Sequence, residues 1–304
     1  MKKTIISFIV IYLICGTISA QTAKDYYERG NEKSKVGKYK EAILEYDKSI
    51  KLNSSIGSAF RNRALAKSKT GNIKGAINDY NNAIKIDPKD FMSFLGRGSL
   101  FSEQKKYDSA TKDFTEAIRL NQNNEIGYTL RGNLYKELNQ FKKALQDYNK
   151  SILINPNDIE VYFNRANVKM ALNDNESAIS DFSKVITVNP NDAISYRNRG
   201  ALKYRLKNYS GALIDLNKSI SIRSNDPKSF DIRGLAKSKL RDFNGALFDF
   251  ENVIKFDQNN AEAYYNKAIC EIAIGQNQNG CSDLYKAKSL GYEKASEIIS
   301  LFCN

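Results

Sequence analysis

This chain of 304 residues has no histidine. The residues left that could carry chemistry are charged pairs, cysteines and asparagines. The chain therefore lacks the usual general base and the commonest metal ligand. A serine or cysteine nucleophile would have no imidazole to activate it. Gly37-Lys38 lacks the rest of a P-loop, and Gly96-Arg97-Gly98 is only a fragment of a dinucleotide-binding loop. We expect no enzymatic activity, no cofactor and no metal.

Cations and acids recur in two columns, with each acid sixteen residues after its cation. The cations are Arg29, Arg63, Arg97, Arg131, Arg165, Arg199, Arg233 and Lys267. The acids are Glu45, Asp79, Asp113, Asp147, Asp181, Asp215, Asp249 and Asp283. The arginines could form an anion-binding stripe, but we favour a structural ladder in which each is paired and its stem is packed.

Both columns belong to a longer pattern with a period of 34 residues. Small residues mark it at Ala42, Ala76, Ala110, Ala144, Ala178, Ala212, Ala246 and Gly280. We number each repeat so that this marker is position 20; position 4 is then always aromatic and position 8 always small. A fixed period of this size predicts stacked helix-turn-helix units. The repeats are 23–56, 57–90, 91–124, 125–158, 159–192, 193–226, 227–260 and 261–294.

The pattern resembles the tetratricopeptide repeat (TPR) family, as the unit Tyr128–Pro156 illustrates with Gly132, Ala144 and Tyr148. It departs from the family in lacking tryptophan at position 4 and in carrying a cation at position 7. The resemblance implies an all-α fold, a right-handed α-solenoid spanning residues 21–294. Repeat 8 departs most, and residues 293–304 are predicted to contain a capping helix with Ala295, Ile298, Ile299 and Phe302 on its apolar face.

In that family the first helices line a concave groove, where positions 2, 5, 6, 9, 12 and 13 face the ligand. The resemblance places there the asparagines Asn31, Asn62, Asn133, Asn164, Asn167 and Asn198. It also places there the apolar residues Leu95, Ile126, Phe163, Met170 and Ile194. Amides can bind a peptide backbone without reading its sequence, and apolar residues can hold its side chains. The alternative is that the asparagines reflect general asparagine richness and bind only water.

The family's carboxylate clamp for chaperone tails is not supported. Repeats 1 to 3 keep Asn31 and Asn62, but Tyr27, Met92 and Gly96 stand where the clamp needs cations.

Residues 1–20 are typical of a secretory signal peptide. Lys2 and Lys3 precede an apolar stretch from Ile5 to Ile14, and we predict cleavage after Ala20. An uncleaved anchor is the alternative, but a bilayer needs about twenty apolar residues. Lipid attachment at Cys15 is disfavoured because the bulky Ile14 precedes it. We therefore expect a periplasmic or secreted protein, with envelope association as an option.

Export would permit disulfides, and three cysteines would remain after cleavage. We predict a bridge between Cys281 and Cys303 that fastens the terminal helix to the last repeat, and this leaves Cys270 over. The alternative is three buried free thiols.

The net charge of +13 is spread over the chain, which is compatible with nucleic acid, anionic lipid or acidic polymers as partners. No nucleic-acid-binding motif appears, so we expect no specific nucleic-acid partner. We expect a non-catalytic scaffold that binds a peptide or protein segment in its concave groove. The alternative is an envelope component that binds an anionic surface or cell-wall polymer through its basic exterior.

Overall fold

The computed structural model describes residues 21–303. In this range every regular element is an α-helix and no strand occurs. The signal peptide expected at residues 1–20, Cys15 included, lies outside the described residues. The helices are α2 (Ala23–Lys35), α3 (Tyr39–Leu52), α4 (Gly57–Lys69), α5 (Ile73–Ile86), α6 (Phe91–Glu103), α7 (Tyr107–Leu120), α8 (Glu125–Glu137), α9 (Phe141–Ile154), α10 (Ile159–Ala171), α11 (Asn175–Val188), α12 (Ala193–Arg205), α13 (Tyr209–Ile222), α14 (Pro227–Lys239), α15 (Phe243–Phe256), α16 (Ala261–Ala273), α17 (Asn277–Ser289) and α18 (Ala295–Phe302).

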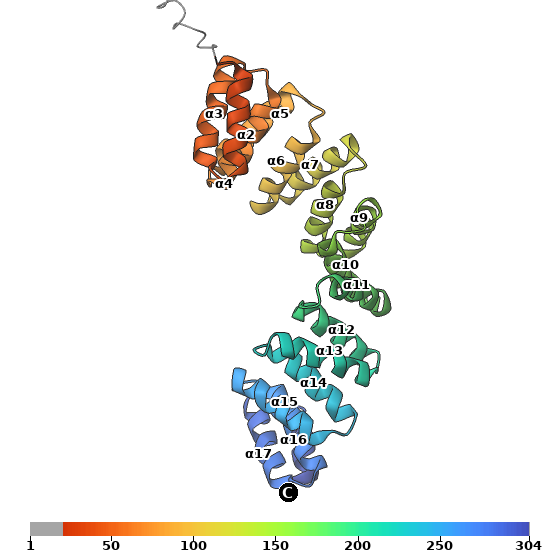
Figure 1. The fold of residues 1–304 in the computed structure, drawn as a ribbon. Helices are drawn as coiled ribbons and strands as arrows, with labels where there is room; N and C mark the ends of the chain where they lie inside the picture. The colour runs from red at the N-terminus through yellow and green to blue at the C-terminus, as the bar shows by residue number, and fades with distance from the viewer. Residues whose placement is uncertain (1–20, 304) are drawn as a thin grey trace, which may run out of the picture. The chain divides into compact units, whose positions relative to one another are not determined.

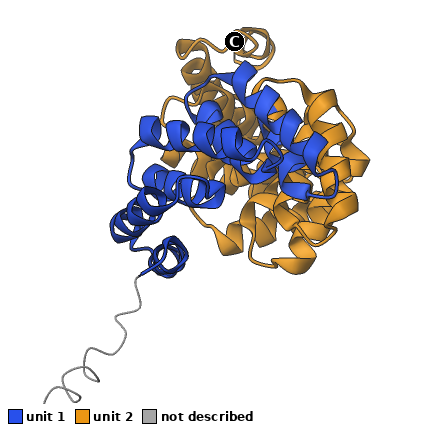
Figure 2. Ribbon diagram, turned by 90° about the horizontal axis from the view of Figure 1, so that it is seen from above, with its two compact units in different colours: residues 1–134 blue, residues 135–304 orange. Residues whose placement is uncertain are grey.

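The described residues divide into two compact units, which we call unit 1 (residues 21–134) and unit 2 (residues 135–303) (Figure 2). In unit 1, α2 packs on α3, α4 on α5 and α6 on α7, and α3–α4 and α5–α6 contacts join these pairs. In unit 2 the same alternation runs from α9 to α17, and α18 packs on α17 (Figure 1). The first helices of successive pairs also touch, as α2 does α4 and α12 does α14. Contacts confined to the same or the next helix pair are those of an all-α solenoid.

The turn inside each helix pair has the same backbone at position 15, which lies in the left-handed region. The residues with this conformation are Gly37, Gly71, Lys105, Asn139, Asn173, Lys207, Arg241 and Gly275, with φ between 55° and 84°. The next amide then bonds back across the helix end, as from Asn72 N to Lys67 O at 2.9 Å. This bond satisfies a carbonyl that would otherwise have no partner at the helix end. Only three of these positions carry the glycine that such a turn favours.

Positions 8, 20 and 24 form the contact between the two helices of a pair. The position-20 alanines are fully buried, and so are the rings of Tyr148, Phe182 and Phe250 at position 24. A Cβ added to Gly30 would lie 2.5 Å from the ring of Tyr46, and one added to Gly98 would lie 2.8 Å from that of Phe114. Position 8 is small because the aromatic ring of the second helix lies directly on the first.

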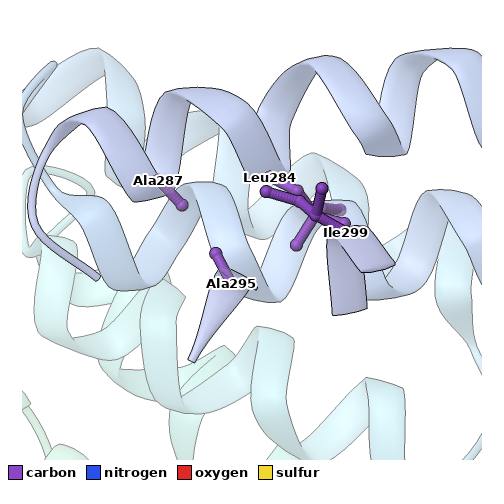
Figure 3. Close-up of a cluster of buried hydrophobic side chains, with 5 residues drawn as sticks. Leu284, Ala287, Ala295 and Ile299 are labelled. Atoms are coloured by element: carbon purple, nitrogen blue, oxygen red, sulfur yellow. The ribbon is translucent and has the colours of Figure 1, made fainter. Parts of the chain in front are cut away.

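The C-terminal helix α18 covers the end of the last pair, in the way expected of a cap. Ala295 and Ile299 join Leu284 and Ala287 in a buried cluster (Figure 3). The expectation for Phe302 was wrong, because its side chain is 51% exposed. The helix ends at this residue, and the side chain of Cys303 packs against the cluster instead.

Candidate functional site

The two charged columns are paired in the structure, as predicted. Arg63, Arg97, Arg165, Arg199 and Arg233 each donate two hydrogen bonds to the aspartate sixteen residues later. The Nε–Oδ2 distances are 2.8–2.9 Å and the Nη2–Oδ1 distances are 2.6–2.7 Å. These are bidentate, charge-assisted pairs, and they occupy most of the hydrogen-bond donors of each arginine. They argue against an anion-binding stripe.

The third nitrogen of these five guanidinium groups, and that of Arg131, reaches the second helix of the preceding repeat. Nη1 donates to an oxygen at position 25, on Asp47, Asn81, Thr115, Asn149, Ser183 or Asn217. One arginine therefore ties helices of two successive repeats. This contact was not predicted, although the sequence contains a signal for it: position 25 carries a side-chain oxygen in every one of these repeats.

The asparagines expected in the groove bond partly to one another. Asn31 Oδ1 accepts from Asn62 Nδ2 at 2.8 Å and from the hydroxyl of Tyr46 at 2.8 Å. Asn62 Nδ2 also lies 3.2 Å from the hydroxyl of Tyr27. Within the described residues, Asn31 Nδ2 and Asn62 Oδ1 make no hydrogen bond, so the two N–H groups of Asn31 and the amide oxygen of Asn62 remain for a ligand.

In unit 2 the corresponding pair is weaker, because Asn198 Nδ2 lies 3.4 Å from Asn167 Oδ1. Asn167 also donates to Phe163 O at 3.0 Å. Asn164 is only 7% exposed and accepts from Lys136 Nζ at 2.6 Å, so its oxygen is already engaged. Burial lowers the pKa of Lys136. Asn133 lies half-buried on α8.

The apolar candidates differ in exposure. Ile126 is 41% exposed and Leu95 is 5% exposed, and both border one cavity of unit 1. In unit 2 Phe163 packs edge-on against Phe182, with the ring centroids 5.9 Å apart. Phe163 and Met170 both pack against a buried cluster, and Ile194 is half-buried. The unit 2 candidates therefore act largely as core residues.

Two adjoining cavities lie on the first helices of unit 1. The first, of about 390 Å³, is named here the polar cavity and is lined by Asn31, Ser34, Lys35, Tyr39, Asn62 and Lys69, among others. The second, of about 310 Å³, is named the apolar cavity and is lined by Arg61, Tyr80, Met92, Leu95, Ser99 and Ile126, among others. Asn62 and Leu65 border both cavities. The structure thus brings four predicted site residues of α2, α4, α6 and α8 to one surface.

Tyr46 lines the polar cavity and donates to Asn31, and Tyr80 lines the apolar cavity. Loss of solvent raises the pKa of Tyr46 to about 12, and it raises the pKa of Tyr80 to about 12 as well. Both hydroxyls are therefore neutral at physiological pH. The apolar cavity opens beside Gly96, where the missing side chain leaves room for the ring of Tyr80.

Unit 2 presents an acid at the groove position that Arg61 occupies in unit 1. Asp231 lies at position 5 of repeat 7, and burial raises its pKa to about 6, with a smaller contribution from the negative charge of Glu262. In the part of the chain that the structure describes, no cation forms an ion pair with Asp231. This carboxylate was not among the predicted site residues.

Within residues 21–303, no group of three or more acids and cysteines is arranged to hold a metal ion. No helix in that range has the length and apolar content to cross a membrane.

Models of one repeat family match this sequence over most of the helix pairs. A model described as "TPR repeat" matches residues 132–173, and two described as "Tetratricopeptide repeat" match residues 24–56 and 159–192 and residues 61–128. The chain belongs to the tetratricopeptide repeat family. None of the curated proteins matches the sequence of this TPR protein.

Solved TPR structures resemble it in fold. YrrB, titled "a TPR protein with an unusual peptide-binding site", shares 24% identity at a TM-score of 0.56, covering 60% of this chain and 95% of YrrB. A TPR protein from Parabacteroides merdae shares 23% identity at a TM-score of 0.56 and covers 83% of this chain and 100% of that one. The C-terminal part of a TPR protein from Cytophaga hutchinsonii shares 17% identity at a TM-score of 0.66, with 79% and 98% covered. These likenesses show that the chain shares the TPR fold.

Proposed function

We propose that this TPR protein is a non-catalytic scaffold that binds a peptide or protein segment on the first helices of unit 1. The observation that carries the proposal is the pair of adjoining cavities, one polar and one apolar, with Asn62 between them. A segment lying across both could bond its backbone to the free amide atoms of Asn31 and Asn62 and place side chains beside Ile126. YrrB is described as a TPR protein with an unusual peptide-binding site, and this likeness supports the same class of function here.

A substitution at Ile126 tests the proposal. Ile126→Glu places a charge in the apolar cavity at a side chain that is already 41% exposed, so the fold should persist. The matched control is Leu153→Glu on α9, which changes an apolar residue that is 75% exposed and borders neither cavity. Partners recovered with the wild-type chain from native extract should be lost with Ile126→Glu and kept with Leu153→Glu. Equal recovery with both variants would count against the groove.

The second candidate function is that of an envelope component that binds an anionic polymer. The dependence of binding on salt concentration distinguishes it from peptide binding. Binding through dispersed exterior charge weakens steeply between low and moderate ionic strength, because the exposed charges are screened. Binding in the cavities should depend chiefly on Ile126. Partner binding that is lost at moderate salt and is unchanged by Ile126→Glu would favour the polymer-binding function.

We also propose that the protein is exported, from the signal-like residues 1–20 and the disulfide between Cys281 and Cys303. Disulfides persist in oxidising compartments. Mass spectrometry of the native protein should give a chain that begins at Gln21. A native chain that retains Met1 would contradict this proposal.

A further inference from the structure

Two lysines of the polar cavity have no acidic partner. Lys35 and Lys69 end α2 and α4 at the same repeat position and line one cavity. No carboxylate lines this cavity. Among the described residues neither ammonium forms an ion pair, whereas the nearby Lys33 and Lys67 pair with Glu41 at 2.7 Å and with Asp79 at 2.8 Å. Two unpaired cations facing one hollow produce a positive potential that a negatively charged group would neutralise.

The neutral polar groups beside these lysines suit a carboxylate. Asn31 Nδ2 is without a hydrogen-bond partner in residues 21–303, and Ser34 lines the same cavity. A carboxylate oxygen accepts hydrogen bonds and donates none, so it can use an ammonium, an amide and a hydroxyl at once.

The adjoining apolar cavity suits an apolar side chain of the ligand. Met92 and Ile126 are 44% and 41% exposed, and the buried Leu95 lines the same cavity. Arg61 is the charged residue of this cavity, and its Nη1 is held by Asp90 Oδ1 at 2.8 Å. The guanidinium is therefore held and its charge balanced by Asp90, which leaves the methionine and the aliphatic side chains available to apolar groups.

We infer that the segment bound by unit 1 is acidic and apolar in adjacent stretches. Its carboxylates lie in the polar cavity between Lys35 and Lys69, and a large aliphatic or aromatic side chain lies in the apolar cavity against Met92 and Ile126. This inference rests on the proposed function and specifies its ligand. Charge complementarity provides orientation and faster association, and the apolar contact provides most of the affinity.

Fluorescence anisotropy with defined peptides tests the inference on the full chain. The probe is a fluorescein-labelled ten-residue peptide with two glutamates followed by leucine and phenylalanine. Its controls replace the glutamates with glutamine, or the leucine and phenylalanine with serine. At about physiological salt, we expect each replacement to weaken binding by roughly tenfold.

Charge-reversal variants locate the site. Lys35→Glu with Lys69→Glu should weaken binding of the acidic probe by more than tenfold and bring it to the level of the glutamine peptide. The matched control is Lys74→Glu with Lys85→Glu on α5, which makes the same change in net charge at exposed lysines outside both cavities. That pair should alter affinity by less than twofold, and circular dichroism should show both variants folded.

The failures are distinguishable. An equal loss with both charge-reversal pairs would show general attraction to a basic surface and overturn the inference. Equal affinity for the glutamate and glutamine peptides, with loss on Ile126→Glu, would overturn the acidic specificity but leave peptide binding intact. A wild-type chain that binds none of the three peptides would overturn the inference, while the recovery of native partners decides the proposed function separately.

Discussion

The guanidinium of Arg199 lies edge-on to the carboxylate of Asp215, with Nε to Oδ2 at 2.9 Å and Nη2 to Oδ1 at 2.6 Å. The Asp215 side chain is 1% exposed, and Lys203 Nζ approaches its second oxygen at 2.8 Å. Nη1 of Arg199 donates a hydrogen bond to Oγ of Ser183 at 2.9 Å. One charged side chain thus connects α12 to both α13 and α11.

Removal of this arginine should destabilise unit 2 strongly. Arg199→Met leaves Asp215 buried with only Lys203, and losing one partner of a buried pair costs about 3–5 kcal/mol. The free energy of unfolding in urea should fall by that order, whereas Arg205→Met at an exposed position should change it by less than about 0.5 kcal/mol. The double variant Arg199→Met/Asp215→Leu should recover part of the loss. A loss no larger than that of the Arg205 control would contradict the ladder as a stabilising feature.

The left-handed turns predict opposite effects of two substitutions. Gly71 has φ 83° and open space around its Cβ position, so Gly71→Ala should cost about 1 kcal/mol from backbone conformation alone. Lys207 has φ 62°, so Lys207→Gly should relieve strain and raise the melting temperature. Thermal denaturation of both variants measures the signs. A melting temperature lowered by Lys207→Gly would show that its side chain stabilises the turn by another route.

Asp231 predicts a pH-dependent stability difference. Its pKa rises from 3.8 to about 6, so the folded state favours the protonated acid. The cost of holding the charged form is fully present above pH 6, shrinks as the pH falls toward 3.8 and is absent below it. Asp231→Asn should therefore raise stability by about 1–2 kcal/mol at pH 7.5 and by nothing near pH 4. Urea titrations at both values check this, and a gain that does not depend on pH would contradict it.

The Cys281–Cys303 disulfide should hold the capping helix. The bridge joins α17 to the residue after α18, with a Cα–Cα distance of 5.5 Å. Cross-links of this kind typically contribute about 2–4 kcal/mol. Reduction of the wild-type chain should raise amide exchange in α18 and expose Leu284, and Cys281→Ala/Cys303→Ala should exchange equally fast with and without reductant. Unchanged protection of α18 after reduction would show that its apolar contacts suffice.

The groove was the hardest feature to predict, and its residues show why. Asn31, Asn62, Leu95 and Ile126 line the two adjoining cavities, because their repeat positions fix which face of the helix they occupy. Exposure depends on neighbours that the repeat pattern does not specify. Phe163 occupies the same position as Leu95, yet its ring packs against Phe182. Lys35 and Lys69 were not predicted as site residues. The sequence does not show which of the lysines at helix ends form an ion pair and which do not.

The sequence by itself determined the all-α fold, the repeat boundaries and the arginine–aspartate columns, since a fixed period of 34 residues forces every copy into the same helix register. Tertiary structure alone decided where each guanidinium sends its third hydrogen bond, which turns hold non-glycine residues at positive φ, and which asparagines are already bonded to each other. Those features depend on distances between successive helix pairs, and a one-dimensional pattern contains no distances. The two adjoining cavities lined by Lys35, Asn62 and Ile126 also depend on such distances. The sequence gives the residue types of their lining, and the packing of the helices creates the cavities.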